Sequence, residues 1–349
     1  MPLQGTLRPV GLFIGLVALA ACFVGSIKLG LTHIDWYTMM DAWQASDPTK
    51  EQLVVKTTRL PRALIAVCVG ASLGIAGALM QALTRNPLAS PGIFGINAGA
   101  AFFVVMASSF FSVRSYASFT WIAFLGAAVS GLVVYGLSTL GREGLTPIKL
   151  TLAGAAITAF FNTLTQGILV TDENALDEIL YWLSGSIVGR NLETLVNVLP
   201  FFAIAWVVAL LLGRSITTLT IGEDVAKGLG QRTAWVKLTA ALAVVLLAGG
   251  SVAVAGPIGL VGLVIPHLAR FLVGSDYRWI LPYCAVLGAT FLLLADIGAR
   301  YLIMPGGPVM AFLSDLGAHV LSDEVPVGVL TALIGAPFFI YIARRSVSE

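Results

Sequence analysis

The chain has 349 residues, of which 58% are hydrophobic and only 11% are charged, and its formal net charge is +2. A soluble domain carries about 25% charged residues, so this composition excludes a single water-soluble domain and indicates a membrane protein. The small net charge is spread along the chain, which argues against a nucleic-acid-binding surface.

Apolar runs long enough to cross a bilayer recur along the sequence. A spanning helix needs about 20 mostly apolar residues. Such runs, the eighth of them short, occupy residues 9–30, 60–83, 92–111, 118–140, 147–170, 194–213, 234–256, 258–273, 280–302 and 326–343. We therefore predict an all-α, polytopic membrane protein with about ten transmembrane helices, forming a single transmembrane domain over residues 1–349.

The loops between these runs sort by charge. Basic residues of short loops are enriched on the cytoplasmic side of a membrane. With the N-terminus inside, the cytoplasmic segments carry twelve of the 20 basic residues and five of the 18 acidic ones. This bias predicts cytoplasmic N- and C-termini, long external loops at 31–58, 171–193 and 303–325, and a long cytoplasmic loop at 214–233.

The three cysteines, Cys22, Cys68 and Cys284, all fall within apolar runs. A disulfide framework is therefore not expected, and no Cys/His spacing indicates a metal site. The segment ending at Cys22 resembles a lipoprotein cleavage signal, but the apolar run continues beyond it. An uncleaved first helix fits better.

Small residues and helix breakers are placed unevenly. The Gly70-x3-Gly74 spacing in the second run favours close helix packing. Residues 86–97 and 255–267 interrupt the helical pattern with Pro, Gly and Asn. Irregular backbone at membrane depth is tolerated inside protein or beside water, so each interruption is either a helix boundary or part of a transport pathway.

Buried charge is sparse, which limits the alternatives. Asp296 and Arg300 are spaced to form an i,i+4 ion pair in the ninth run. An ion-coupled secondary transporter would need a buried carboxylate, and Asp296 is the one candidate. An intramembrane enzyme would need a zinc-binding His pair or a serine beside a base, and Ser90 and Ser251 have no histidine nearby in sequence.

The cytoplasmic loop 214–233 contains a helix signature. A helix can start at Thr220 or Gly222, and the acidic residues that follow suit its positive end. Glycines can end it two turns later. Three apolar residues at four-residue spacing then share one face: Ile221, Val225 and Leu229. This stripe predicts contact with a membrane surface or a partner protein, with a solvated local helix as the alternative.

No Gly-x4-Gly-Lys-Ser/Thr motif occurs in the sequence. The chain therefore has no P-loop of its own. If transport uses ATP, the ATPase must be another polypeptide.

Several motifs, in order, resemble the permease subunits of bacterial ABC importers for ferric siderophores, haem and vitamin B12. The matching stretches span nearly the whole chain and are residues 59–62, 77–81, 86–92, 219–230, 256–270, 273–278, 294–296 and 326–337. The resemblance implies a BtuC-like, type II permease of the bacterial cytoplasmic membrane that is not itself an enzyme. It implies a second permease subunit, two cytoplasmic ATPase subunits and an extracytoplasmic substrate-binding protein as partners.

The resemblance also assigns residues by matching position. Coupling to the ATPase falls on Leu219, Ile221, Gly222, Glu223, Asp224, Ala226, Lys227, Gly228, Leu229, Gly230, Pro266, His267 and Arg270. Docking of the binding protein falls on Arg59, Arg62 and Arg300, with lipid headgroup contact or pairing with Asp296 as the alternative. For the pathway and gate, the resemblance assigns Thr146 and Pro147, and the interruptions of the helical pattern add Asn86, Pro87, Gly256 and Pro257.

The resemblance implies that this subunit binds no cofactor directly, since ATP and Mg would be bound by the partner ATPase. Residues 271–277 are most similar to siderophore permeases, so a ferric siderophore is the expected cargo, with haem and vitamin B12 left open. One departure concerns residues 303–322, which form a longer external link than the family usually has.

Overall fold

The computed structural model describes residues 3, 5, 7–30, 34–42, 49–113, 115–141, 145–171, 180–302 and 324–348. Over these residues the chain forms helices and no strand. The first half contains α1 (Leu7–Lys28), α2 (Trp36–Asp41), α3 (Lys50–Val54), α4 (Leu60–Thr84), α5 (Ile96–Phe111), α6 (Tyr116–Thr139) and α7 (Pro147–Thr171). The second half contains α9 (Leu192–Ile221), α10 (Glu223–Gly228), α11 (Thr233–Ala255), α12 (Val261–Val273), α13 (Tyr277–Ile297) and α15 (Val327–Ser348).

Three short turns of other helix types adjoin these elements. The π-helical η1 (Val55–Arg59) joins α3 to α4, and the π-helical η3 (Gly298–Leu302) continues α13. The 3-10 turn η2 (Pro91–Phe94) precedes α5.

Apolar helices occupy the positions of all ten predicted spans. Seven of the described helices are long and apolar enough to cross a membrane, and three shorter ones lie at Ile96–Phe111, Val261–Val273 and Val327–Ile340. The predicted all-α, polytopic class is confirmed, with ten as an approximate number of crossings. The external segment 303–322 lies outside the described residues.

The boundary of the cytoplasmic loop differs from the prediction. We expected a loop from residue 214, but α9 runs unbroken to Ile221, so only residues 222–232 separate it from α11. The sequence offers no breaker between Gly213 and Gly222. The hydroxyls of Thr217 and Thr218 also donate back to the carbonyls four residues earlier, which lets polar side chains continue the helix.

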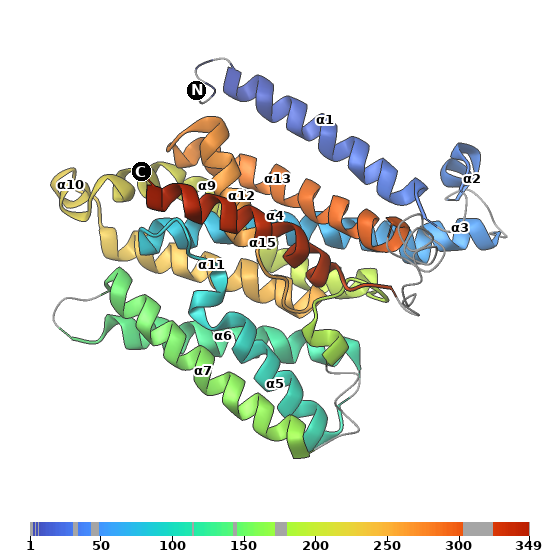
Figure 1. Cartoon of the computed structure of the whole chain (residues 1–349), viewed down its shortest axis with the longest axis horizontal. Helices are drawn as coiled ribbons and strands as arrows, with labels where there is room; N and C mark the ends of the chain where they lie inside the picture. The colour runs from blue at the N-terminus through green and yellow to red at the C-terminus, as the bar shows by residue number, and fades with distance from the viewer. Residues whose placement is uncertain are drawn as a thin grey trace.

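The helices form two groups (Figure 1). Helices α5, α6 and α7 pack together along one side, and α6 and α5 contact α11. Helix α4 lies at the centre of the larger group and contacts α9, α11, α12 and α13. Both chain ends lie at the end of the long axis that carries α10, whereas α2 and α3 lie at the opposite end (Figure 1).

Glycines of α4 explain its central position. An added Cβ at Gly70 would overlap the carbonyl of Gly288 in α13, and one at Gly77 would overlap the carbonyl of Gly262 in α12. At Gly74 it would overlap the carbonyl of Cys284. The predicted packing role of the Gly70-x3-Gly74 spacing is therefore confirmed, and backbones approach at distances that only glycine permits.

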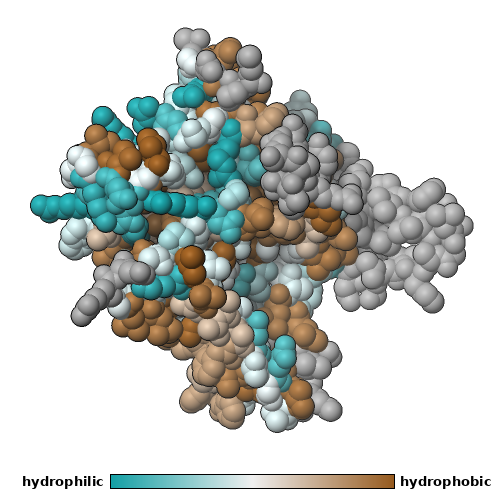
Figure 2. All heavy atoms as spheres, turned by 60° about the vertical axis from the view of Figure 1, so that its left-hand side comes forward, coloured by the Kyte–Doolittle hydropathy of each residue, from teal (hydrophilic) through white to brown (hydrophobic). Residues whose placement is uncertain are grey.

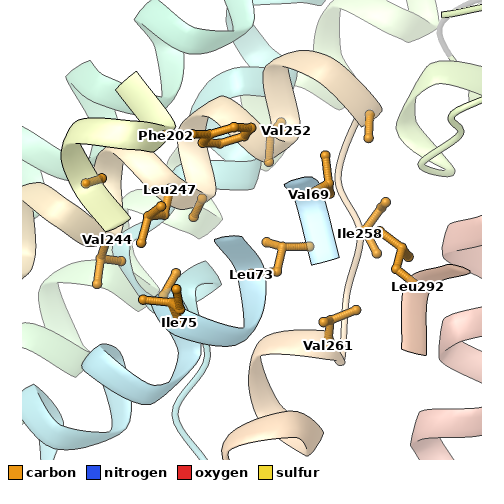
Figure 3. Packing of buried hydrophobic residues seen from close by; sticks show 14 of the residues in the cluster. Val69, Leu73, Ile75, Phe202, Val244, Leu247, Val252, Ile258, Val261 and Leu292 are labelled. Carbon is orange, nitrogen blue, oxygen red and sulfur yellow. The ribbon is translucent and has the colours of Figure 1, made fainter. Parts of the chain in front are cut away.

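The core between these helices is built from branched aliphatic side chains and Phe202. Figure 3 shows Val69 and Leu73 of α4 facing Ile258 and Val261, while Phe202 of α9 lies beside Val252 of α11. These residues lie far apart in the sequence, so the core holds α4, α9 and α11–α13 as one packed unit.

The surface is apolar over much of its area. Figure 2 shows hydrophobic atoms dominating its lower part, where α5–α7 lie, and hydrophilic atoms concentrated toward the end that carries α10. Only 17% of the most apolar 18-residue stretch of α7 is buried, whereas 83% of the corresponding stretch is buried in the span that contains α4. An apolar exposed helix of this kind faces lipid or another subunit.

Candidate functional site

Helix α10 forms where the sequence predicted a short cytoplasmic helix. Gly222 accepts the first hydrogen bond, from the amide of Ala226 at 3.0 Å. Glu223 and Asp224 occupy the first turn and Lys227 the last, so the charges suit the helix dipole. The chain leaves the helix through Gly230, whose φ of +78° lies in the left-handed region that favours glycine.

The three residues of the predicted apolar stripe are exposed but do not share one helix, because the non-helical Gly222 separates Ile221, at the end of α9, from Val225 in α10 and Leu229 just after it. Ile221, Val225 and Leu229 are 70%, 48% and 71% exposed. The opposite side is anchored by Leu219 and Ala226, which are fully or almost fully buried. Exposed apolar side chains at one face of a polar end of the molecule form a surface suited to a partner. The remaining assigned residues of this segment, Asp224, Lys227, Gly228 and Gly230, are also exposed.

Glu223 fastens α10 to the neighbouring helix α11. Its carboxylate lies 2.6 Å from Lys237 Nζ and 3.2 Å from Lys227 Nζ, and it accepts a hydrogen bond from the Thr233 hydroxyl at 3.3 Å. Partial burial acts to raise the pKa of Glu223, but hydrogen bonds from Lys237 and Lys227 outweigh it and hold the pKa below its usual value. The carboxylate is therefore charged at neutral pH.

Lys237 also reaches the segment before α7. Its Nζ donates to the carbonyl of Leu145 at 3.2 Å, and the residue is 8% exposed. A cavity of about 290 Å³ opens at this junction. It is lined by Tyr135, Thr139, Leu145, Glu223, Lys227, Thr233, Ala234 and Lys237. The start of α10, the start of α11 and the start of α7 therefore meet at one place.

A second set of polar contacts ties the end of α9 to α13. Thr217 accepts a hydrogen bond from the Tyr277 amide at 2.9 Å and donates to Asp276 at 3.4 Å. Hydrogen bonds from Arg278 lower the pKa of Asp276, which also lies 3.9 Å from Arg8. Gln231 donates to the carbonyl of Ser215 at 3.0 Å and closes the turn after α10.

Pro266, His267 and Arg270 lie in α12. The C-terminal end of this helix leads through Gly274 to Asp276, and Asp276 contacts α9 one turn before its end. Arg270 therefore lies at the same end of the molecule as α10. Pro266 is buried, and His267 and Arg270 are half-buried.

The three arginines predicted to dock a binding protein gather at the opposite end. Arg59, Arg62 and Arg300 are each at most 7% exposed. Arg62 Nε lies 2.5 Å from Asp296 Oδ1, and its other nitrogens donate to both carboxylate oxygens of Glu324. Within this conformation the guanidinium of Arg62 is therefore engaged by acidic groups of its own chain.

Arg59 and Arg300 bind the end of α1. Arg59 donates to the carbonyls of Ile27 and Lys28 at 2.7 and 2.8 Å, and Arg300 donates to the carbonyl and hydroxyl of Ser26. Arg300 Nε also lies 3.5 Å from Asp296 Oδ2, which is the i,i+4 ion pair that the spacing predicted. A docking role for these arginines stays a prediction.

The structure places the predicted pathway positions in three separate places. Thr146 begins α7, where its hydroxyl accepts from the Lys149 amide at 3.3 Å, and Pro147 is the first helical residue. Asn86 and Pro87 form an exposed turn between α4 and η2. Gly256 and Pro257 follow the far end of α11, about 35 Å from the start of that helix at 1.5 Å per residue.

A cavity lies beside the contact between η2 and α7, and both elements line it. Its volume is about 470 Å³, and Thr151, Thr158 and Asn162 supply polar groups to a lining that also includes Ser90, Gly92, Ile93, Gly154, Ala155 and Ala159. The carbonyl of Ile93 occupies the space that a side chain at Gly154 would need. One interruption of the helical pattern therefore lines a cavity together with α7.

The second interruption has a different environment. Gly256 packs against the carbonyl of Trp182, and Gly185 packs against the carbonyl of Pro257. Its backbone is thus held by the described part of the segment 171–193, which was predicted to be external, at the end of the molecule away from α10.

Sequence reasoning missed three residues of these sites: Lys237, Thr217 and Glu324. A lysine one turn inside an apolar run was a usable signal for Lys237, since such a charge needs a partner. The partners of Thr217 and Glu324 lie 59 and 262 positions away, and spacing along the chain gives no sign of them.

Comparison with known proteins agrees with this architecture. The model of the FecCD transport family matches residues 18–322. A protein of Bacillus subtilis named a probable siderophore transport system permease protein, YfiZ, is 54% identical, over 96% of this chain and 94% of its own length. The Fe(3+)-citrate import system permease protein YfmD of the same organism is 45% identical, over 90% of this chain and 87% of its own.

A solved structure gives the same result for the fold. A chain described as an inward-facing conformation of a metal-chelate type ABC transporter is 32% identical, with a TM-score of 0.79, and the match covers 97% of this chain and 99% of that one. The family match, the two relatives and the shared fold together extend over nearly every described helix. The chain belongs to the FecCD transport family.

Proposed function

We propose that this chain is the permease subunit of an ATP-driven importer that moves a ferric siderophore across the bacterial cytoplasmic membrane. The observation that carries the proposal is the surface of α10. Three exposed apolar side chains lie on or beside α10: Ile221 ends α9, Val225 lies in α10 and Leu229 directly follows it, and Glu223 anchors α10 to α11. A helix that is both exposed and rigidly attached is suited to receive motion from a partner.

The family supports the cargo as well as the machinery. The relatives at 54% and 45% identity are named for siderophore and for Fe(3+)-citrate transport, and both cargoes are chelated iron. Haem and vitamin B12 are the alternatives, and direct uptake measurements separate the three. The subunit itself catalyses no reaction.

The proposed assembly contains partners that supply what this chain lacks. Two cytoplasmic ATPase subunits bind ATP and Mg and contact α10, with Pro266, His267 and Arg270 near the same surface. A second permease subunit covers the exposed side of α7, so that the cavity lined by Thr151, Thr158 and Asn162 becomes part of an enclosed pathway. An extracytoplasmic binding protein delivers the cargo.

The outer arginines constrain how that binding protein docks. Arg62 already has two acidic partners in this chain, Asp296 and Glu324. Docking through Arg62 therefore requires acidic groups of the binding protein to replace one of them. Arg59 and Arg300 donate hydrogen bonds to the end of α1, and Arg300 also pairs with Asp296, which makes them a support for the docking surface.

The proposal is tested with the complete transporter in lipid vesicles. The chain is co-purified with its ATPase, and uptake of labelled ferric siderophore, haem and cobalamin is measured with the corresponding binding proteins. ATP-dependent uptake of a ferric siderophore is expected, and uptake of haem or cobalamin instead would reassign the cargo. Uptake that persists without ATP but needs an ion gradient would identify a secondary transporter.

The α10 surface is tested by substitution of its most exposed leucine. Leu229→Asp removes the burial of one leucine, worth about 1.5–3 kcal/mol, so ATPase affinity should fall by roughly 10- to 100-fold. Tyr37→Asp is the matched control, since Tyr37 is 85% exposed at the opposite end and should leave ATPase binding unchanged. Equal affinity of the Leu229 variant would remove the basis of the assignment.

Orientation has its own test. Gly228→Cys places a thiol at the exposed end of α10. It should react with a membrane-impermeant maleimide only after cells are opened. Reaction in intact cells would place α10 outside, where no ATPase could bind it.

A further inference from the structure

The link from α10 to α7 passes through one buried side chain. Lys237 Nζ lies between the Glu223 carboxylate, at 2.6 Å, and the Leu145 carbonyl, at 3.2 Å. Glu223 is the first residue of α10, and Leu145 stands two positions before the first residue of α7. We propose that Lys237 is a positioning residue that transmits the displacement of α10 to the start of α7.

The proposal rests on the function proposed above, in which an ATPase moves α10. It adds a route by which that movement reaches the pathway. Neither composition nor the family assignment points to Lys237, which lies inside the seventh apolar run.

The burial of Lys237 favours movement of α10 together with the segment before α7 over movement of α10 alone. Lys237 is 8% exposed, and an ammonium group at such a position is stable only while its partners remain in place. If Glu223 moved away alone, the lysine would retain a single described acceptor, a neutral carbonyl. Following Glu223 instead keeps the ion pair but pulls on the Leu145 carbonyl. The link therefore resists separation of α10 from the segment before α7.

The surroundings leave room for this movement. The cavity of about 290 Å³ has Glu223, Lys237 and Leu145 in its lining, so these groups can shift without overlapping a packed core. On its buried side, α10 itself is held by one small side chain, Ala226. The ion pair is thus the strongest described attachment of α10 to α11.

The receiving element is placed to act on transport. Thr146 and Pro147 directly follow Leu145 and begin α7. Four residues after Pro147, Thr151 enters the lining of the 470 Å³ cavity. Because a helix moves as a rigid element, displacement of its first turn changes the position of this lining along its length.

The test measures coupling rather than activity alone. In the reconstituted complex with ATPase and binding protein, the number of substrate molecules transported per ATP hydrolysed is compared between variants. Lys237→Met should lower this ratio by about tenfold, within the range typical of coupling energies, while ATPase binding and basal hydrolysis persist. Lys237→Arg, which keeps the charge and can donate to both acceptors, should largely retain the ratio.

A matched control and a second variant complete the design. Arg232→Met removes an exposed positive charge five residues earlier and should leave the ratio unchanged. Glu223→Gln removes the other end of the link and should lower the ratio as Lys237→Met does. A normal ratio in Glu223→Gln or in Lys237→Met would overturn the proposal. Loss of assembly in both Lys237→Met and Lys237→Arg would also overturn it, because it would show that the lysine is purely structural.

Failure of the proposed function gives a different result. In that case the unmodified chain would neither bind an ATPase nor show ATP-dependent uptake. A defect in Lys237→Met is interpreted only against an unmodified complex that transports.

Discussion

Arg62 and Asp296, 234 positions apart in the sequence, lie with Nε and Oδ1 separated by 2.5 Å, and the Asp296 side chain is completely buried. The pair joins the start of α4 to the end of α13. Arg62 extends the contact to Glu324, just before α15, and Arg300 lies on the other side of Asp296. The Asp296 carboxylate therefore joins α4 to the end of α13, and Arg62 links both to the residue before α15 through Glu324.

Asp296→Asn should destabilise the protein strongly. The substitution leaves Arg62 and Arg300 buried beside a neutral group, and breaking a buried ion pair by removing one partner costs about 3–5 kcal/mol. Thermal unfolding of the purified protein in detergent measures the effect. Asp224→Asn, at an exposed position of α10, should leave the unfolding temperature unchanged. Equal stability of the two variants would show that the cluster contributes little.

Gly77→Ala should disrupt the contact between α4 and α12. The added Cβ would overlap the backbone carbonyl of Gly262, which cannot move as a flexible side chain would. Overpacking of this kind costs about 1–3 kcal/mol. Gly136→Ala in α6 is the control, because nothing lies within 4 Å of its added Cβ and alanine is the better helix former. The two substitutions should therefore change the unfolding temperature in opposite directions.

The attachment of α10 should weaken in acid. The pKa of Glu223 in the folded protein lies below its ordinary value of about 4.3, so its ion pair stabilises fully above about pH 5 and is lost as the pH falls through the lowered pKa. Protection of the amides of residues 222–232 against hydrogen exchange, measured relative to their intrinsic exchange rates at each pH, should fall below about pH 4 in the native chain. In Glu223→Gln the exchange of this segment should already be faster at pH 7 and should not gain this step. An identical step in both proteins would assign it to another group.

Thr217→Val should loosen the end of α9. The substitution keeps the shape of the side chain but removes the acceptor for the Tyr277 amide, and with it the single hydroxyl proton that is shared between the Gly213 carbonyl, at 2.9 Å, and Asp276, at 3.4 Å. Each lost hydrogen bond costs about 1 kcal/mol. Thr239→Val, whose hydroxyl donates only to carbonyls of its own helix, is the control in the same unfolding measurement. A loss no greater than that of the control would show that α9 and α13 are held together by packing alone.

Much of the architecture could be predicted because each membrane-spanning helix satisfies its own backbone hydrogen bonds. Length and hydropathy then locate a helix without knowledge of its neighbours. The same local chemistry predicted α10, because Gly222, the acidic first turn and Gly230 define its ends, whereas the predicted single stripe is divided at Gly222, which leaves Ile221 on α9. The Asp296–Arg300 pair was predictable for the same reason, since both residues lie on one helix.

Prediction failed where a long-range contact decides the outcome. The end of α9 was placed too early because a run of threonines reads as loop, although their hydroxyls bond within the helix. Arg59 and Arg62 were assigned to docking, with lipid headgroups or Asp296 as alternative partners, but nothing in the sequence shows that Ile27 and Glu324 are also partners.

The sequence by itself determined the class of protein, the approximate spans and the exposed stripe of α10, since these depend on residues within a few turns of one another. Only the tertiary structure decided that Lys237 lies between Glu223 and Leu145, and that Asp296 joins two arginines from different helices. The physical reason is that a buried charge must find a partner, and in a helical bundle that partner is chosen by how helices pack rather than by distance along the chain.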